Sequence, residues 1–222
     1  MTGRATPLDT GSTARERAAL ALLVLGLATA VVVRTTLVPQ RWHTAYNLGI
    51  GAFSVLVARA GGLRADDLGV SPAHVGAGLR WGGAAFGAIT LVVAVGAVAG
   101  LLEDDRTDIS AGDVLWKVGV TIPLGTVLIE ELAFRGALHG LLERTTTAGR
   151  AWAAGAVLFG LWHVPGAWSD GAAVVAGTFV ATTAAGAGFV WLRRRSGSLV
   201  APILAHLGTN SSTFALSWAA TR

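Results

Sequence analysis

Two adjacent glutamates, Glu130 and Glu131, lie inside the apolar stretch VTIPLGTVLIEELAFRGALHGLL, whereas the other 11 of the 13 carboxylates fall in loops, tails or run ends. Burying a charge in a bilayer costs at least about 2.5–3.5 kcal/mol on insertion scales. Each carboxylate is therefore expected to have a structural or functional role that offsets this cost. In a helix, Glu131 and Arg135 are spaced i,i+4 in the order that favours an ion pair. Glu130 points about 100° away and has no local partner, which indicates protonation or a role as a general base.

Two further motifs place hydrogen-bonding side chains in apolar runs. Phe159 and His163 share a helix face in FGLWH, and His206 and Asn210 share a face in HLGTN. Taken singly, a histidine in an apolar helix is more often a satisfied core residue, and a His/Asn pair is typical of interhelical hydrogen bonding. For the glutamates, the corresponding structural alternative is an ion-pair network in the core of a transporter or bundle.

The polar side chains of the three motifs are expected at a similar depth along their helices. Counted from the predicted inner helix ends at a rise of about 1.5 Å per residue, Glu130 and His163 both lie roughly 20 Å in. His206 and Asn210 lie about 16 and 22 Å in. The four side chains are therefore predicted to meet in one layer, which favours a functional site over scattered structural polar groups.

The remaining histidines are not expected at this site. His139 follows Glu130 by nine residues and faces the opposite side of the helix. His43 and His74 fall in loops and are interpreted as surface residues. Gly136 is expected to let a neighbouring helix approach closely.

The composition predicts membrane-spanning helices that would position these residues. Of the 222 residues, 53% are hydrophobic and 14% are charged, against about 25% charged in soluble domains. The apolar runs are 18–33, 44–60, 78–102, 112–142, 150–165, 171–192 and 198–219. We expect an all-α, polytopic transmembrane helical bundle of about seven (six to eight) spans. Residues 1–16 are expected to be a polar N-terminal tail, and residues 17–222 a single integral membrane domain.

The first run could also be a signal peptide, but we expect a retained helix because the run continues past its small residues and further spans follow. The chain has no cysteine, which excludes disulfides and thiolate metal sites. Its net charge of +4 comes from basic residues scattered between apolar runs. This pattern favours charges that set membrane topology, with no nucleic-acid partner.

The distribution of basic residues predicts the orientation of the chain. With a cytoplasmic N-terminus and seven spans, 11 of the 17 basic residues lie in inner segments and five in outer ones, as the positive-inside rule requires. The acidic stretch 103–108 then lies outside. Seven of the eight tryptophans fall near run ends, as in an interfacial belt; the exception is Trp162, beside His163. We therefore expect a multi-pass protein of the cell membrane.

At these residues the sequence resembles the CPBP family of CAAX proteases and bacteriocin-processing or Abi proteins, which includes the Ras-converting CAAX endopeptidase. The family motifs EExxxR, FxxxH and HxxxN/H match Glu130-Glu131-Leu-Ala-Phe-Arg135, Phe159-Gly-Leu-Trp-His163 and His206-Leu-Gly-Thr-Asn210 in the same order, within about residues 112–215. The resemblance implies an intramembrane endopeptidase acting on a peptide or protein substrate.

The resemblance also implies a role for each motif residue. Glu130 and His163 would activate a water, while His206 and Asn210 would stabilise the oxyanion. The residues that support the site would be Glu131, Arg135 and Phe159.

Two alternatives follow from the same residues. Relatives are often named metalloproteases, and Glu130, His163 and His206 could supply a His₂Glu zinc shell. There is no HExxH helix, however, and a glutamate used as a ligand cannot also be the base, so a mechanism without a cofactor is favoured. The other alternative is a non-catalytic membrane transporter or binding or assembly factor that uses the same polar pocket. A transporter would be expected to show inverted repeats, which the sequence lacks.

Overall fold

The computed structural model describes residues 13–102 and 109–220, and every regular element in these ranges is helical. The α-helices are α1 (Ala14–Thr36), α2 (His43–Ala60), α3 (Ala65–Leu68), α4 (Val75–Val98), α5 (Ala111–Trp116), α6 (Leu128–Glu130), α7 (His139–Thr145), α8 (Ala148–His163), α9 (Ala172–Ser196), α10 (Val200–Leu207) and α11 (Thr213–Ala220). The π-helical segments are η3 (Lys117–Thr121), η4 (Pro123–Val127), η5 (Glu131–Leu138) and η7 (Gly208–Ser212). The 3₁₀ turns are η1 (Gln40–Trp42), η2 (Pro72–His74) and η6 (Val164–Asp170).

The predicted all-α class is confirmed, and each of the seven predicted apolar runs coincides with a helical segment. α1 begins inside the stretch predicted as a tail; residues 1–12 and the acidic stretch 103–108 lie outside the described residues. The helices long and apolar enough to cross a membrane are Ala14–Thr36, Pro72–Val98, Ala111–Thr145 and Ala172–Ser196. The count of seven spans is not confirmed. α8, for example, has 16 residues, fewer than the roughly 20 that a bilayer core requires.

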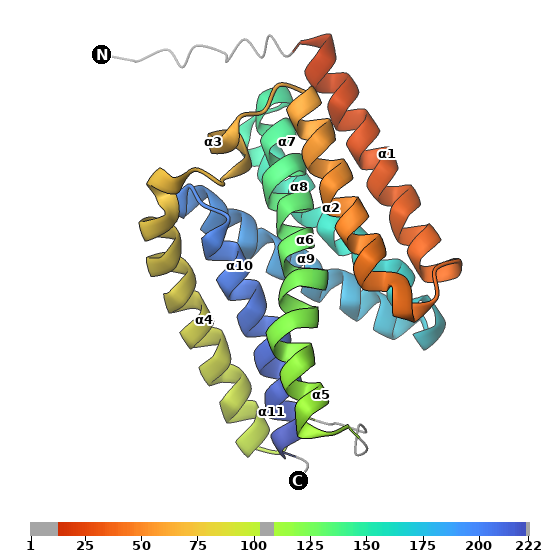
Figure 1. The fold of residues 1–222 in the computed structure, drawn as a ribbon, viewed down its shortest axis with the longest axis vertical. Coiled ribbons are helices and arrows are strands. Elements are labelled where there is room, and N and C mark those ends of the chain that lie inside the picture. The colour runs from red at the N-terminus through yellow and green to blue at the C-terminus, as the bar shows by residue number, and fades with distance from the viewer. Residues whose placement is uncertain (1–12, 103–108, 221–222) are drawn as a thin grey trace.

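The segment that carries the two glutamates lies at the centre of the bundle (Figure 1). α5, α6 and α7 join through π-helical turns into one continuous rod, Ala111–Thr145. α1 packs beside α2, α4 beside α10, and α8 along α9. Within the rod, η5 contacts α1, α2, α8, α9 and α10. Side chains on η5 can therefore meet residues from most of the other helices.

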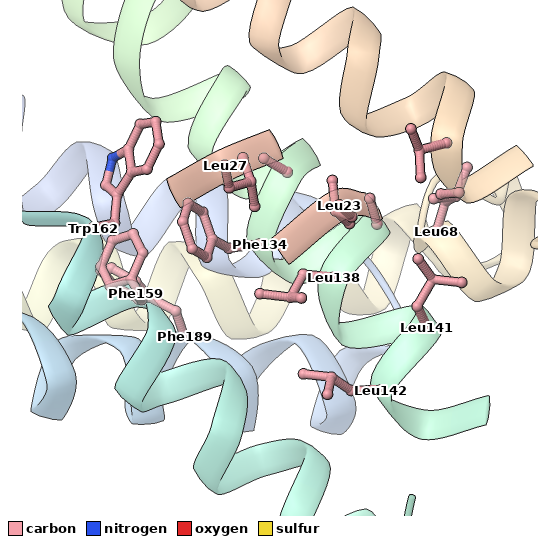
Figure 2. Close-up of a cluster of buried hydrophobic side chains, with 14 of the residues drawn as sticks. Leu23, Leu27, Leu68, Phe134, Leu138, Leu141, Leu142, Phe159, Trp162 and Phe189 are labelled. Atoms are coloured by element: carbon pink, nitrogen blue, oxygen red, sulfur yellow. The ribbon is translucent and has the colours of Figure 1, made fainter. Parts of the chain in front are cut away.

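A buried apolar cluster holds the rod against α1 and α8 (Figure 2). Leu23 of α1 and Leu138 and Leu141 of the rod are fully buried. Phe134 of η5 packs edge-on against Phe159 of α8, with 5.2 Å between ring centroids. In a bilayer, where lipid is as apolar as these side chains, close packing rather than exclusion of water would be their contribution.

Two glycines allow the close approaches that this packing needs. A Cβ atom on Gly136 would lie 3.3 Å from the Leu68 carbonyl oxygen of α3, so the predicted close approach is confirmed. A Cβ on Gly160 would lie 2.0 Å from Thr183 Oγ1 of α9. α8 is thereby seated directly on α9, which fixes the position of the α8 residues that follow Gly160.

A network of charged side chains ties together the ends of α7 and α9 with α3. Arg144 forms an ion pair with Asp67 at 2.8 Å, and Arg193 donates hydrogen bonds of 3.0 Å to the carbonyl oxygens of Asp66 and Asp67. Burial raises the pKa of Asp67, but the backbone N–H of Arg64 and the Arg144 guanidinium together outweigh it, so its pKa is lowered overall.

Candidate active site

The Glu130 carboxylate is buried between two imidazole rings. Trp162 Nε1 donates a hydrogen bond of 3.2 Å to Glu130 Oε1, whereas Oε2 has no hydrogen-bond partner among the described residues. Glu130 Oε2 faces His163 Nε2 at 3.9 Å and His206 Nε2 at 3.8 Å. These separations are too long for hydrogen bonds but short enough for one water to bridge a pair of acceptors. The structure thus brings residues of all three motifs together.

His163 is the last residue of α8. The α-helix gives way after His163 to the 3₁₀ turn η6, in which Pro165 has no backbone N–H to donate to the carbonyl oxygen one turn earlier. His163 Nδ1 lies 2.8 Å from the Phe159 carbonyl oxygen. Since a carbonyl only accepts, Nδ1 carries the hydrogen, and Nε2 of the neutral ring presents a lone pair toward Glu130. The side chain is 27% exposed, so His163 lies at the open edge of the site.

His206 is buried and is held from both sides. Its Nδ1 lies 2.8 Å from Glu131 Oε1, and its Nε2 lies 3.3 Å from Asn210 Nδ2. The Thr209 hydroxyl donates to the His206 carbonyl oxygen at 2.8 Å and also lies 3.3 Å from Asn210 Oδ1, so the amide oxygen faces Thr209 and the amide nitrogen faces the ring. Nδ1 of His206 therefore donates to the carboxylate, and Nε2 accepts one amide hydrogen. The second amide hydrogen of Asn210 has no hydrogen-bond partner in residues 13–102 and 109–220.

Glu130 and Glu131 point about 100° apart on the helix, yet both reach the same histidine. Both carboxylates lie next to His206, Glu130 on the Nε2 side at 3.8 Å and Glu131 on the Nδ1 side at 2.8 Å. Neighbouring helical side chains do diverge, as expected. The imidazole lies between the divergent pair, and its two nitrogens face different acids.

The predicted pair of Glu131 and Arg135 forms inside the protein, at 3.2 Å, with side-chain exposures of 0% and 1%. The Arg135 guanidinium carbon also lies 3.9 Å from the centroid of the Phe159 ring and 4.8 Å from that of Phe189. The Phe189 ring stacks on His206 with 4.9 Å between centroids. Ion pairing and two aromatic faces thus stabilise a cation that has no access to water.

Residues 113–212 match the family model of Rce1-like type II CAAX prenyl endopeptidases. The match contains every motif residue and confirms the resemblance inferred from the three motifs. It covers less than half of the 222 residues and leaves α1 to α4 outside. No curated protein and no solved structure matches the chain.

Three site residues were not predicted from sequence. Trp162 and Phe189 belong to the Rce1-like region, whereas Arg34 of α1 lies outside it, with its guanidinium carbon 5.5 Å from the centroid of the Trp162 ring. One sequence feature sets Trp162 apart: it lies beside His163 and away from the ends of the apolar runs. No sequence feature marks Arg34 or Phe189, because their contacts depend on which helices pack together.

The other histidines make contacts of their own. His139 is 1% exposed, and its Nε2 lies 3.3 Å from Glu143 Oε1, one turn farther along α7. His43 Nε2 lies 3.0 Å from the Val38 carbonyl oxygen. His74 is exposed, as expected for a surface residue, and packs beside Gly197.

An apolar pocket of about 250 Å³ lies beside the candidate site, between α1 and α8. Phe134 and Trp162 form part of its wall, and Val31 and Leu158 complete it from the two helices. Because the indole of Trp162 also bonds to Glu130, this single side chain separates the pocket from the carboxylate.

The candidate site can also be compared with a zinc shell. Ligands of one tetrahedral zinc lie about 3.3 Å apart, from metal–ligand distances near 2.0–2.1 Å. Glu130 Oε2 is 3.8–3.9 Å from the two Nε2 atoms, and the Nε2 lone pair of His206 already accepts from Asn210. Among residues 13–102 and 109–220, no group of three or more His, Asp or Glu side chains is arranged to hold a metal ion. The side chains in this arrangement do not fit zinc.

Proposed function

We propose that the protein is an intramembrane endopeptidase that hydrolyses a peptide bond with a water activated by Glu130. The observation that carries this proposal is the buried, unpartnered Oε2 of Glu130, which faces the Nε2 atoms of His163 and His206. A buried carboxylate oxygen without a partner is costly, so it is retained for a ligand. The match to a family of prenyl endopeptidases supports a peptide or protein as that substrate.

The attacking water lies between Glu130 Oε2 and His163 Nε2. Both atoms are acceptors, so the water donates one hydrogen to each and its oxygen lone pair is directed outward to the substrate carbonyl carbon. As the carbon–oxygen bond forms, Glu130 takes the proton. His163 fixes the direction of attack through the second hydrogen bond.

Asn210 supplies the hydrogen bond to the developing oxyanion. Its amide is held by Thr209 and His206, so its second N–H is oriented before the substrate binds. Loss of one such donor typically costs about 2.7–4 kcal/mol of transition-state stabilisation. His206, whose single hydrogen is used on Glu131, positions the amide. When the carbon–nitrogen bond breaks, the proton held by Glu130 passes to the departing amine.

We further propose a multi-pass arrangement with a cytoplasmic N-terminus. Arg194 at the end of α9 pairs with Glu143 of α7, and Arg144 at the end of α7 pairs with Asp67 of α3. Arg15 at the start of α1 donates to the Ala60 carbonyl oxygen at the end of α2. Arg34 and Lys117 lie at the opposite ends of their segments. This asymmetry follows the positive-inside rule. α2, α8 and the α10–α11 segment would complete seven passes.

The proposal is tested with Glu130→Gln. The amide keeps an oxygen for Trp162 but cannot take a proton, so cleavage should fall to background while expression and membrane insertion are retained. Peptidomics of membranes from cells with each form should reveal peptides produced only by the wild type. Glu143→Gln, a carboxylate farther along the same rod, is the matched control and should keep full activity. Full activity of Glu130→Gln would refute the base assignment, and identical peptide sets would favour a non-catalytic binding role.

A further inference from the structure

A second polar pocket lies where α8 begins and α9 ends, away from the three motifs. It encloses about 370 Å³ and is lined by Trp152, Trp191, Arg194 and Arg195. Two aromatic rings and two guanidinium groups around one cavity are suited to a ligand that combines negative charge with an apolar part.

The walls of this pocket are held in place before any ligand binds. Trp152 Nε1 donates a hydrogen bond of 3.0 Å to the Ala187 carbonyl oxygen, which joins α8 to α9. Trp191 packs edge-on against Trp81 of α4, with 5.5 Å between ring centroids. The Arg195 guanidinium carbon lies 4.9 Å from the centroid of the Trp81 ring. Three helices thus fix the shape of the pocket.

The pocket carries net positive charge. Arg194 pairs with Glu143 at 3.5 Å, and the same carboxylate also contacts His139. A single carboxylate therefore offsets the charge of Arg194. No carboxylate in the part of the chain that the structure describes forms an ion pair with Arg195. Arg194 Nη1 also contacts the Ala148 carbonyl oxygen at 3.5 Å, which places the start of α8 beside the pocket. The side chain before that start makes no capping hydrogen bond, so the first-turn N–H groups add to the positive potential.

The location of this pocket at the end of a candidate span indicates which kind of anion can reach it. Arg194 and Arg195 lie at the end of the candidate span Ala172–Ser196, and the residues Trp152 and Trp191 are 39% and 50% exposed. Exposed tryptophan beside arginine at the end of a span is typical of the headgroup level of a bilayer. A ligand there is reached from the membrane, with apolar chains that extend past the indole rings.

We propose that this pocket binds the phosphate headgroup of an anionic phospholipid. The phosphodiester oxygens accept hydrogen bonds from Arg195 and Arg194, and the first carbons of the acyl chains lie against the two indoles. The inference requires the chain to lie in a membrane, but it does not require catalysis.

The test measures retained lipid by native mass spectrometry. Protein purified from vesicles of equal parts phosphatidylglycerol and phosphatidylcholine should retain phosphatidylglycerol preferentially. Arg195→Gln should weaken this retention about fivefold, the contribution of one basic side chain near an anionic surface. Arg80→Gln removes the same charge from α4 without lining the pocket and should retain lipid as the wild type does. Equal losses in the two variants would overturn the proposal in favour of diffuse surface attraction.

A second measurement uses the wild type alone, so it does not depend on how a variant folds. Brominated phosphatidylglycerol should quench tryptophan fluorescence more strongly than brominated phosphatidylcholine, and unbrominated phosphatidylglycerol should reverse the difference. Equal quenching by the two lipids would contradict the site. Reversal by millimolar inorganic phosphate as effective as reversal by lipid would show an ion site rather than a lipid site. Neither result bears on Glu130, so this proposal and the peptidase proposal can fail separately.

Discussion

Replacing Glu131 with Gln is expected to destabilise the protein, whereas the same change at Glu130 is not. Glu131 is fully buried and holds Arg135 at 3.2 Å and His206 at 2.8 Å. The amide removes the negative charge and leaves the Arg135 guanidinium, 1% exposed, without a counter-charge. Glu130 has no such cation in direct contact, and Gln at that position keeps an oxygen for Trp162.

The magnitude follows from the burial of the pair. Breaking a buried ion pair by removing one partner costs about 3–5 kcal/mol. The lower end applies to Glu131→Gln because its carbonyl oxygen still accepts a hydrogen bond from His206. For a chain of this size, about 3 kcal/mol corresponds to a fall in Tm of roughly 6–12 °C. For Glu130→Gln, a change in the free energy of unfolding within about 1 kcal/mol is expected.

Thermal unfolding in one detergent, followed by tryptophan fluorescence, measures both variants against the wild type. The double variant Glu131→Gln/Arg135→Met removes both charges and should recover part of the loss, because no buried cation remains unpaired. A wild-type Tm for Glu131→Gln, or an equal fall for Glu130→Gln, would refute the assignment of a structural role to one acid and a chemical role to the other.

Three further outcomes are expected. Trp162→Phe removes the hydrogen bond to Glu130 and should lower kcat at least about tenfold, since hydrogen bonds to charged groups are worth about 1.5–3 kcal/mol; an unchanged kcat in proteoliposomes would contradict this. Exhaustive chelation, checked by elemental analysis, should leave activity intact; loss restored by zinc would overturn the metal-free mechanism. The lowered pKa of Asp67 contributes stability above its unfolded value, about 3.9, and this is lost as pH falls through the folded pKa. Asp67→Asn should therefore flatten the fall in Tm between pH 5 and 3.

The sequence was sufficient to predict the helices but not how they are rotated against one another. Apolar runs long enough to be helical mark each segment, and small residues such as Gly136 mark close contacts. Counting residues along a helix gives the depth of Glu130, His163 and His206 but not the direction in which each side chain points. The bond between Glu131 and His206 joins residues 75 positions apart and depends on that direction.

Local backbone form was also beyond prediction. The π-helical turns η4 and η5, on either side of α6, carry no sequence pattern that predicts a π-helix, although Pro123 at the start of η4 lacks the N–H that an α-helical bond needs. The sequence predicts one apolar run over 150–165, but the α-helix ends at His163 and continues as the 3₁₀ turn η6, which contains Pro165. That early end leaves His163 at the rim of the site.

The position of Phe159 affects how the three motifs can change over time. Its ring lies 4.6 Å from that of His163 and 6.0 Å from that of His206, and it covers the guanidinium of Arg135. A substitution in any one motif therefore alters the surroundings of the other two through one shared neighbour. Lineages that abandon the chemistry should lose several motif positions within a short interval, rather than one at a time.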